Sequence, residues 1–165
     1  MIDSIKNIAI KFWGMNETHN YLIASRENHT YKVFNQNKET FDVIFIDGLH
    51  TADQVEIDIS NALKFLNDQG YIVCHDMNPT SEAMQATPRR KATWTGDCWK
   101  AWVRIRSSNS KLNMFVVDTD FGCGIIKKGK QELLTAEDLT YTNLNNNRKE
   151  WLNLIPTKDF SSYVA

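Results

Sequence analysis

The chain has 165 residues, with 19 basic and 20 acidic side chains and a formal net charge of −1. This length suits one globular domain, and we expect a single α/β domain over residues 1–165. Because the charges balance, composition does not predict nonspecific nucleic-acid binding. Short apolar runs argue against a membrane-spanning helix, and the N-terminus lacks the apolar stretch of a secretion signal.

Cysteine content gives a further constraint. The three cysteines, Cys74, Cys98 and Cys123, include no pair at CxxC spacing. Neither a zinc site nor a disulfide framework is therefore indicated. A reducing cytoplasmic interior is the expected location.

The first 40 residues give a mixed pattern. Apolar side chains within residues 2–13 follow a helical spacing, and Gly14 is placed to end that helix. Tyr21–Ala24 and Thr30–Phe34 have the composition of short strands. Of the seven glycines, only Gly14 lies before residue 48.

A strand–helix–strand pattern follows. Val43–Ile46 is a continuous β-branched and aromatic run, typical of a strand buried on both faces. Thr51 and Gln54 match a capping box at the start of a helix over residues 51–66. Tyr71–Cys74 is a second buried strand. The three elements form a βαβ unit, whose strands we expect to be parallel.

The remaining chain completes an α/β pattern. We expect a polar loop over residues 77–96 and then a helix that is capped by Asp97 and ends near Ser107. Leu112–Val117 and Cys123–Ile126 are expected to form an antiparallel hairpin. A last helix is expected to open at Thr135–Asp138, to be interrupted at Asn145–Asn147 and to end before Pro156. The sequence therefore predicts an α/β fold with a mixed sheet whose last hairpin is antiparallel.

Polar side chains follow both strands of the βαβ unit. Asp47 and His50 come after the first strand, and His75 and Asp76 after the second. Ligands in open α/β sheets bind beyond the carboxyl ends of the strands. We therefore expect Asp47 and Asp76 to share a divalent cation through oxygen ligands, with His50 as a general base beside it. Strand alternation predicts that His75 points away from Asp76.

Other interpretations remain open at this point. The two aspartates could cap helices or accept hydrogen bonds from neighbouring amides, and His50 could be an ordinary solvated residue. Between Arg89 and Lys111 there are seven basic residues and one acid, interleaved with three tryptophans, so this segment could bind a phosphate or stack on a base. Tryptophans at helical spacing are more often part of the core.

Two segments together resemble class I S-adenosylmethionine-dependent methyltransferases. They are Phe41-Asp-Val-Ile-Phe-Ile-Asp-Gly-Leu-His50 and Gly70-Tyr-Ile-Val-Cys-His-Asp-Met-Asn-Pro79, which are similar to the sequences of the small-molecule and sugar O-methyltransferase branch. Met114–Ile126 resembles the antiparallel strand pair that ends that fold. The resemblance implies a Rossmann-like methyltransferase sheet, mainly parallel with a C-terminal antiparallel strand.

The resemblance also implies roles for individual residues. Asp47 and Asp76 match the positions that hold a divalent cation such as Mg²⁺, and His50 matches the position of a catalytic base. Asp47 and Gly48 match positions that meet S-adenosylmethionine. The acceptor would be a small molecule or a sugar.

The N-terminal part departs from the family pattern. Members hold the cofactor with a glycine-rich turn after their first strand, and no such turn occurs before Phe41. We therefore expect N-terminal βα units that are reduced and a truncated methyltransferase. Three hypotheses follow: a metal-assisted O-methyltransferase, a degenerate and non-catalytic binding or assembly module, and a nucleic-acid or phosphate binder using residues 89–111. Strand edges exposed by a reduced sheet would favour a homodimer.

Overall fold

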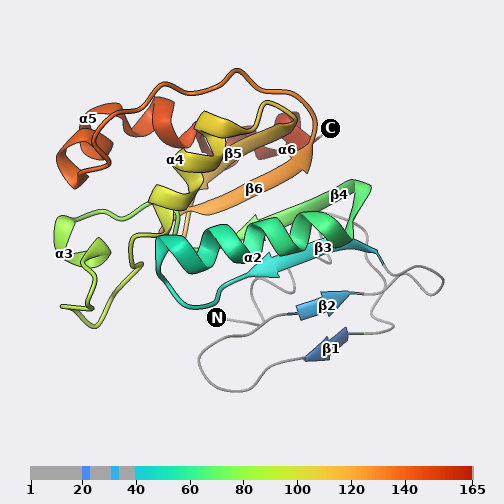
Figure 1. The fold of residues 1–165 in the computed structure, drawn as a ribbon, viewed down its shortest axis with the longest axis horizontal. Helices are drawn as coiled ribbons and strands as arrows, with labels where there is room; N and C mark the ends of the chain where they lie inside the picture. Colours follow the sequence, from blue (N-terminus) through green and yellow to red (C-terminus); the bar gives the residue numbers. More distant parts are fainter. Residues whose placement is uncertain (1–19, 23–30, 34–39, 165) are drawn as a thin grey trace.

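One mixed sheet organises the part of the chain that the structure describes (Figure 1). The structure is a computed structural model, and it describes residues 20–22, 31–33 and 40–164. The strands are β1 (Asn20–Leu22), β2 (Tyr31–Val33), β3 (Phe41–Ile46), β4 (Leu66–Cys74), β5 (Leu112–Asp118), β6 (Cys123–Lys128) and β7 (Leu154–Pro156). The helices are α2 (Ala52–Phe65), α3 (Glu82–Gln85), α4 (Cys98–Ser108), α5 (Tyr141–Leu152) and α6 (Phe160–Val164), with a 3₁₀ turn at Thr157–Asp159.

The strands lie in the order β1-β2-β3-β4-β6-β5-β7. β3 and β4 are parallel, β5 and β7 are parallel, and β6 is antiparallel to both β4 and β5. Among β3 to β7, the four strands β3, β4, β5 and β7 therefore run in one direction, and β6 is opposed. This arrangement confirms the predicted α/β fold, the parallel βαβ pair and the final antiparallel hairpin.

The N-terminal strands add to the β3 edge of the sheet. β1 pairs with β2, and β2 pairs with β3, in each case antiparallel. β2 lies within the predicted strand Thr30–Phe34, and β1 overlaps the predicted strand Tyr21–Ala24 but begins one residue earlier. The helix predicted over residues 2–13 falls outside the described residues.

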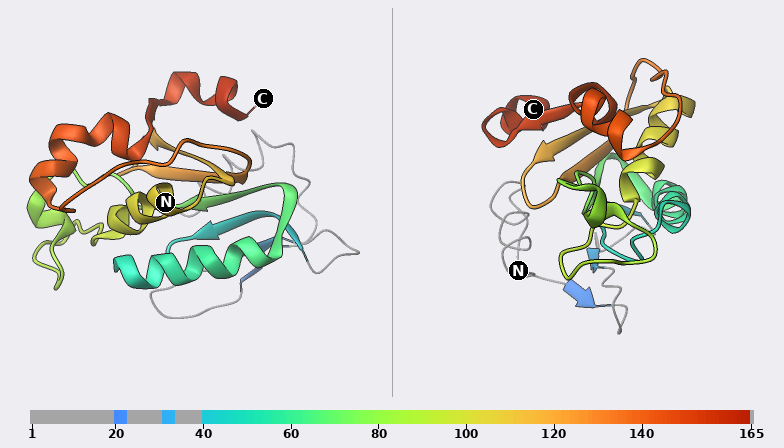
Figure 2. Two further views of the ribbon diagram at one scale, coloured as in Figure 1. Left: turned by 45° about the horizontal axis from the view of Figure 1, so that its top comes forward. Right: turned by 90° about the vertical axis from the view of Figure 1, so that its left-hand side faces the viewer.

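Both faces of the sheet are covered. Ile44, Ile72, Met114 and Ile126 join a large core with residues of α2, α4 and α5. Alternate residues of the same strands form a smaller core on the opposite face, against α6: Val43, Val73, Phe115, Val117 and Ile125. Figure 2 shows α6 on one side of the strands and α2 and α4 on the other. Burial on both faces explains the uninterrupted apolar runs that predicted these strands.

Thr51 and Asp97 occupy the predicted N-cap positions of α2 and α4, but neither side chain makes the predicted capping hydrogen bond. The Thr51 side chain makes no capping hydrogen bond, and Gln54 Nε2 donates to Asp58 Oδ1 at 2.8 Å instead of reaching back. Asp97 does not cap its own helix either, because its Oδ1 accepts from the backbone N–H of Ala52 at 2.8 Å. A carboxylate from another element has therefore replaced the local cap of α2.

Two boundaries also differ from the prediction. β4 begins at Leu66 rather than Tyr71, directly after α2 ends. The last helix begins at Tyr141, where Thr140 Oγ1 accepts from the N–H of Asn143, and not at Thr135. The predicted interruption is confirmed, because Asn147 has non-helical backbone angles inside α5. Among the described residues, no helix has the length and apolarity needed to cross a bilayer.

Candidate functional site

The carboxyl ends of β3 and β4 lie side by side and carry the polar residues that the sequence singled out. Ile46 is opposite Cys74 in the parallel register, so the chain leaves both strands at the same edge of the sheet. Asp47 follows β3 directly, and Asp76 lies two residues beyond β4. Gly48 lies in the turn that leads from Asp47 to α2, and it is half-buried.

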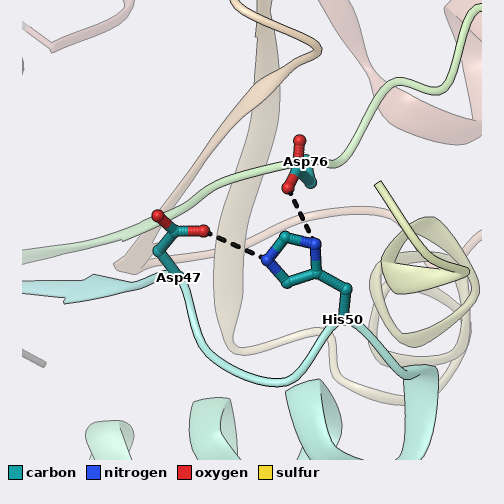
Figure 3. A group of neighbouring side chains, drawn as sticks. All are labelled: Asp47, His50 and Asp76. Atoms are coloured by element: carbon teal, nitrogen blue, oxygen red, sulfur yellow. Dashed lines mark ion pairs between the residues drawn. The ribbon is translucent and has the colours of Figure 1, made fainter. Parts of the chain in front are cut away.

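His50 lies between the two carboxylates (Figure 3). Its Nε2 is 3.4 Å from Asp47 Oδ1, and its Nδ1 is 3.1 Å from Asp76 Oδ2. One ligand atom from each of these three residues lies within 4.8 Å of the others, a spacing that could hold a metal ion. The structure therefore brings Asp47, His50 and Asp76 together as predicted from the sequence.

His75 belongs to the same cluster, contrary to the prediction that it points away. Its Nδ1 lies 3.4 Å from Asp47 Oδ1 and 3.5 Å from Asp76 Oδ2, and its Nε2 lies 3.3 Å from Asp120 Oδ2. Strand alternation failed as a guide because β4 ends at Cys74, and the backbone turns at Asp76. Asp120, from the turn between β5 and β6, gave no sequence signal, because only the antiparallel pairing of β6 with β4 brings that turn close.

Asp76 has a backbone conformation that residues other than glycine rarely adopt. Its φ is 63°, in the left-handed region, and such strain costs about 1–3 kcal/mol. Backbone hydrogen bonds on both sides enforce it, from His75 N to Ile46 O at 3.0 Å and from Met77 N to Gly122 O at 3.0 Å. Strain of this kind is concentrated at functional sites, where the surrounding structure enforces it.

The electrostatics of the cluster favour ionised side chains. Burial alone would raise the pKa of Asp47, but hydrogen bonds from His50 and His75 lower it well below its usual range. Burial opposes protonation of the imidazoles, yet the hydrogen bond that His50 donates to Asp47 and the charge of Asp76 raise the pKa of His50. The same carboxylates raise the pKa of His75 to about 11 despite its burial. In the metal-free protein, the carboxylates of the cluster therefore favour the protonated form of both imidazoles.

A second polar network supports the loop that carries Asp76. The Asn78 side chain is buried, and its Nδ2 donates to Asp118 Oδ1 at 3.0 Å. Arg148, from α5, donates to Asn78 Oδ1 and, at 2.7 Å, to Pro79 O. The sequence did not single out Arg148, because it lies 70 residues beyond Asn78 in an unrelated helix. These hydrogen bonds connect α5 and the end of β5 to the loop after β4.

The basic and aromatic segment divides into core and surface. Trp99 and Trp102 are fully buried, so they cannot stack on a base. Arg104 pairs with Asp53 of α2 at 2.9 Å, and Arg106 donates to backbone carbonyls at the end of α5. The tryptophans at helical spacing are therefore core, as their spacing most often indicates. Trp94 is the exception, because its ring is half-buried against His50.

The cysteines lie outside this chemistry. Burial raises the pKa of the thiols of Cys74, Cys98 and Cys123. Thiols with raised pKa values carry little thiolate near neutral pH, so they are poor nucleophiles and poor metal ligands. None of the three forms a disulfide.

The donor set of the cluster fits a divalent cation. Two carboxylates and one imidazole lie close enough to share an ion, and Asp76 and His75 are almost completely buried in the fold. Carboxylate oxygens suit Mg²⁺ and Mn²⁺, and a neutral imidazole is a common further ligand for transition metals. A bound cation would bring positive charge to the same carboxylates that now favour protonation of His50 and His75.

The comparison with protein families gives a match. A family model described as a methyltransferase domain matches residues 12–77. No curated protein matches the chain. The matched segment contains β3, α2 and β4 together with Asp47, His50 and Asp76, so it covers the candidate site. The match supports a methyltransferase family, and the α/β sheet is consistent with the Rossmann-like methyltransferase fold.

Proposed function

We propose that this protein is an S-adenosylmethionine-dependent O-methyltransferase that acts on a small molecule or a sugar with the help of a divalent cation. The observation that carries the proposal is the convergence of Asp47, His50 and Asp76 inside the segment that matches the methyltransferase domain. The combination supports the proposal better than either observation alone. A cluster of acidic groups by itself is common without a metal, and the match by itself does not identify the reacting residues.

Asp47 and Asp76 are the proposed ligands of the cation. When bound there, a divalent cation lowers the pKa of an acceptor hydroxyl that coordinates it. The two carboxylates come from adjacent strands, so the sheet itself fixes their separation. The strained backbone at Asp76 holds its carboxylate toward His50, 3.1 Å away, and not toward solvent.

His50 is the proposed general base. Its Nε2 points to Asp47, where a coordinated acceptor would present its hydroxyl, and it would take the hydroxyl proton there. The acceptor oxygen could then attack a methyl group held in line with it, and holding the two reactants in that geometry supplies much of the rate enhancement. His75 would orient Asp47 through the contact at 3.4 Å between its Nδ1 and Asp47 Oδ1.

S-adenosylmethionine would supply the methyl group as a sulfonium, whose S–CH₃ bond would break as the O–CH₃ bond forms and leave a neutral thioether. Asp47 and Gly48 are the proposed contacts, because they lie at the carboxyl end of β3, the edge at which open α/β sheets bind ligands. The cofactor assignment depends on the methyltransferase match, which also includes residues before β3.

Calorimetric titration of the full chain with S-adenosylmethionine and with Mg²⁺ tests the proposal. We expect micromolar binding of the cofactor and saturable binding of Mg²⁺. The variant Asp47→Asn should weaken both, whereas the exposed carboxylate of Asp53 offers a matched control, and Asp53→Asn should leave both unchanged. Failure of the wild-type chain to bind either ligand at millimolar concentration would contradict the proposal and favour a non-catalytic module.

A further inference from the structure

Trp94 contacts His50 through both its ring and its backbone. The two ring centroids are 5.3 Å apart with an angle of 23° between the planes, which is a stacked arrangement. The Nδ1 of His50 also lies 3.3 Å from the carbonyl oxygen of Trp94. The two residues are 44 positions apart, and Trp94 lies in a loop between α3 and α4, so only the tertiary structure brings them together.

The loop holds Trp94 firmly in this position. Its indole Nε1 donates to Ala86 O at 2.7 Å, and the Arg89 guanidinium lies over the ring at 5.8 Å from its centroid. The next residue, Thr95, is completely buried, and its backbone N–H donates to Met84 O at 3.0 Å. Both the ring and the carbonyl of Trp94 are therefore held by contacts that do not involve His50.

The carbonyl of Trp94 distinguishes the two nitrogens of His50. A carbonyl oxygen only accepts hydrogen bonds, so Nδ1 must carry a hydrogen in order to use it. The other neighbours of the ring are carboxylates: Asp76 Oδ2 at Nδ1 and Asp47 Oδ1 at Nε2. Nδ1 thus has two acceptors within reach, the Trp94 carbonyl oxygen at 3.3 Å and Asp76 Oδ2 at 3.1 Å, whereas Nε2 has Asp47 Oδ1 at 3.4 Å. A neutral His50 would therefore keep its hydrogen on Nδ1 and present a lone pair at Nε2.

We propose that Trp94 is a positioning residue for His50, whose stacked ring and backbone carbonyl hold the imidazole with its hydrogen on Nδ1 and its Nε2 turned toward Asp47. This inference rests on the proposed role of His50 as the base, because only an unprotonated Nε2 on the Asp47 side could accept the hydroxyl proton. Trp94 acts through His50 and does not contact the reacting atoms.

Long-range ¹H–¹⁵N NMR of the full chain labelled at histidine tests the proposal, because the spectrum distinguishes the two neutral tautomers of an imidazole. The spectrum is recorded in alkaline buffer, and the signals of His50 are assigned by their loss in His50→Gln. We expect the Nδ1–H pattern for His50 in the wild type. In Trp94→Ala the Nε2–H form should increase, since the loop loses the indole bond to Ala86 and the stack.

Two further variants make the result specific. Trp94→Phe keeps an aromatic ring for the stack and loses the indole N–H, so it should restore most of the wild-type pattern relative to Trp94→Ala. Lys91→Ala is the control, because this exposed side chain has no contact with His50 or Trp94 in the described part of the chain, and the pattern should not change. If Trp94→Ala does not fold, the comparison of Trp94→Phe with wild type decides. We then expect a smaller increase of the Nε2–H form of His50 in Trp94→Phe.

Two results would overturn the proposal: an Nε2–H pattern in the wild type, or an unchanged pattern in a folded Trp94→Ala. The test is independent of metal and cofactor binding. A protein with the Nδ1–H pattern that binds neither Mg²⁺ nor S-adenosylmethionine would contradict the proposed function and leave the geometry of Trp94 intact. Binding of Mg²⁺ and S-adenosylmethionine together with an Nε2–H pattern in the wild type would support the proposed function and contradict the role of Trp94.

Discussion

Asp97 caps the N-terminus of a helix to which it does not belong, because its Oδ1 accepts from the N–H of Ala52 at 2.8 Å. Its other carboxylate oxygen lies 3.2 Å from Lys100 Nζ in its own helix. Asp97 thus joins the starts of α2 and α4, and α2 begins two residues after His50. This carboxylate links the helix that follows the candidate site to the loop that carries Trp94.

Removal of this cap should destabilise the protein. Asp97→Ala leaves the N–H of Ala52 without its partner, and the loss of an N-cap side chain costs about 1 kcal/mol, up to about 2 kcal/mol. Urea unfolding monitored by circular dichroism measures the change. Asp68→Ala is the control, because the exposed Asp68 pairs with Lys128 on the surface, and its loss should cost at most a few tenths of a kcal/mol. Equal effects of the two substitutions would contradict a capping role for Asp97.

Gly96 has no room for a side chain, because a Cβ there would lie 1.7 Å from the carbonyl oxygen of His50. Its φ of 60° adds the cost of a left-handed conformation for any other residue. Gly96→Ala should therefore lower the free energy of unfolding by about 2 kcal/mol or more, and it should displace His50. Thermal unfolding measures the first effect, and a changed His50 NMR signal reports the second. Gly129→Ala, with its nearest contact at 3.1 Å and no positive φ, is a matched control with a smaller expected effect.

The strands of the sheet could be predicted from the sequence because their burial leaves a direct signature. Val43–Ile46 and Met114–Val117 are buried on both faces, so their apolar runs are uninterrupted and cannot be confused with amphipathic helices. The caps could not be predicted in the same way. Thr51 and Gln54 satisfy the local capping pattern, but Asp97 competes from elsewhere in the chain, and no local pattern reports a partner 45 residues away.

The residues of the candidate site also divide into those with a local sequence signature and those that depend on distant partners. Asp47, His50 and Asp76 could be found because each follows a strand or begins a helix within one βαβ unit, whose topology is fixed by general rules. Asp120 and Trp94 reach the cluster from other loops, and their approach depends on the packing of the sheet as a whole. His75 was missed because the alternation rule was applied one residue beyond the end of β4.

The strain at Asp76 predicts a difference between two substitutions that both remove the carboxylate. Asp76→Ala retains a Cβ at a φ of 63°, whereas Asp76→Gly relieves the conformational cost. The glycine variant should therefore be more stable than the alanine variant by about 1 kcal/mol, after allowance for the greater freedom of glycine in the unfolded chain. Urea unfolding in the presence of EDTA measures this difference, and an alanine variant of equal or greater stability would show that the backbone at Asp76 is unstrained.

His75 should stabilise the metal-free fold more at acidic than at alkaline pH. Its pKa is about 11 in the folded protein, against about 6.5 in an unfolded chain, so its contribution is complete below about pH 6.5 and declines as pH rises through the folded value. The cost of His75→Gln should therefore be larger at about pH 6 than at about pH 9, by at most about 1.4 kcal/mol per pH unit between these values. Unfolding free energies of wild type and variant in EDTA measure it, and a cost that does not change with pH would contradict the pairing with Asp47 and Asp76.

Binding of a divalent cation should release protons from the cluster. The adjacent carboxylates raise the pKa of both His50 and His75, so they favour the protonated imidazoles in the metal-free protein. A cation on Asp47 and Asp76 would repel the imidazolium charges, so Mg²⁺ and protons compete, and affinity should rise with pH. Calorimetry in two buffers of different ionisation enthalpy counts the released protons. His50→Gln should release fewer protons than wild type, and it should keep its affinity for Mg²⁺ if His50 serves as the base and not as a ligand. An affinity for Mg²⁺ that is independent of pH would place the cation elsewhere on the protein.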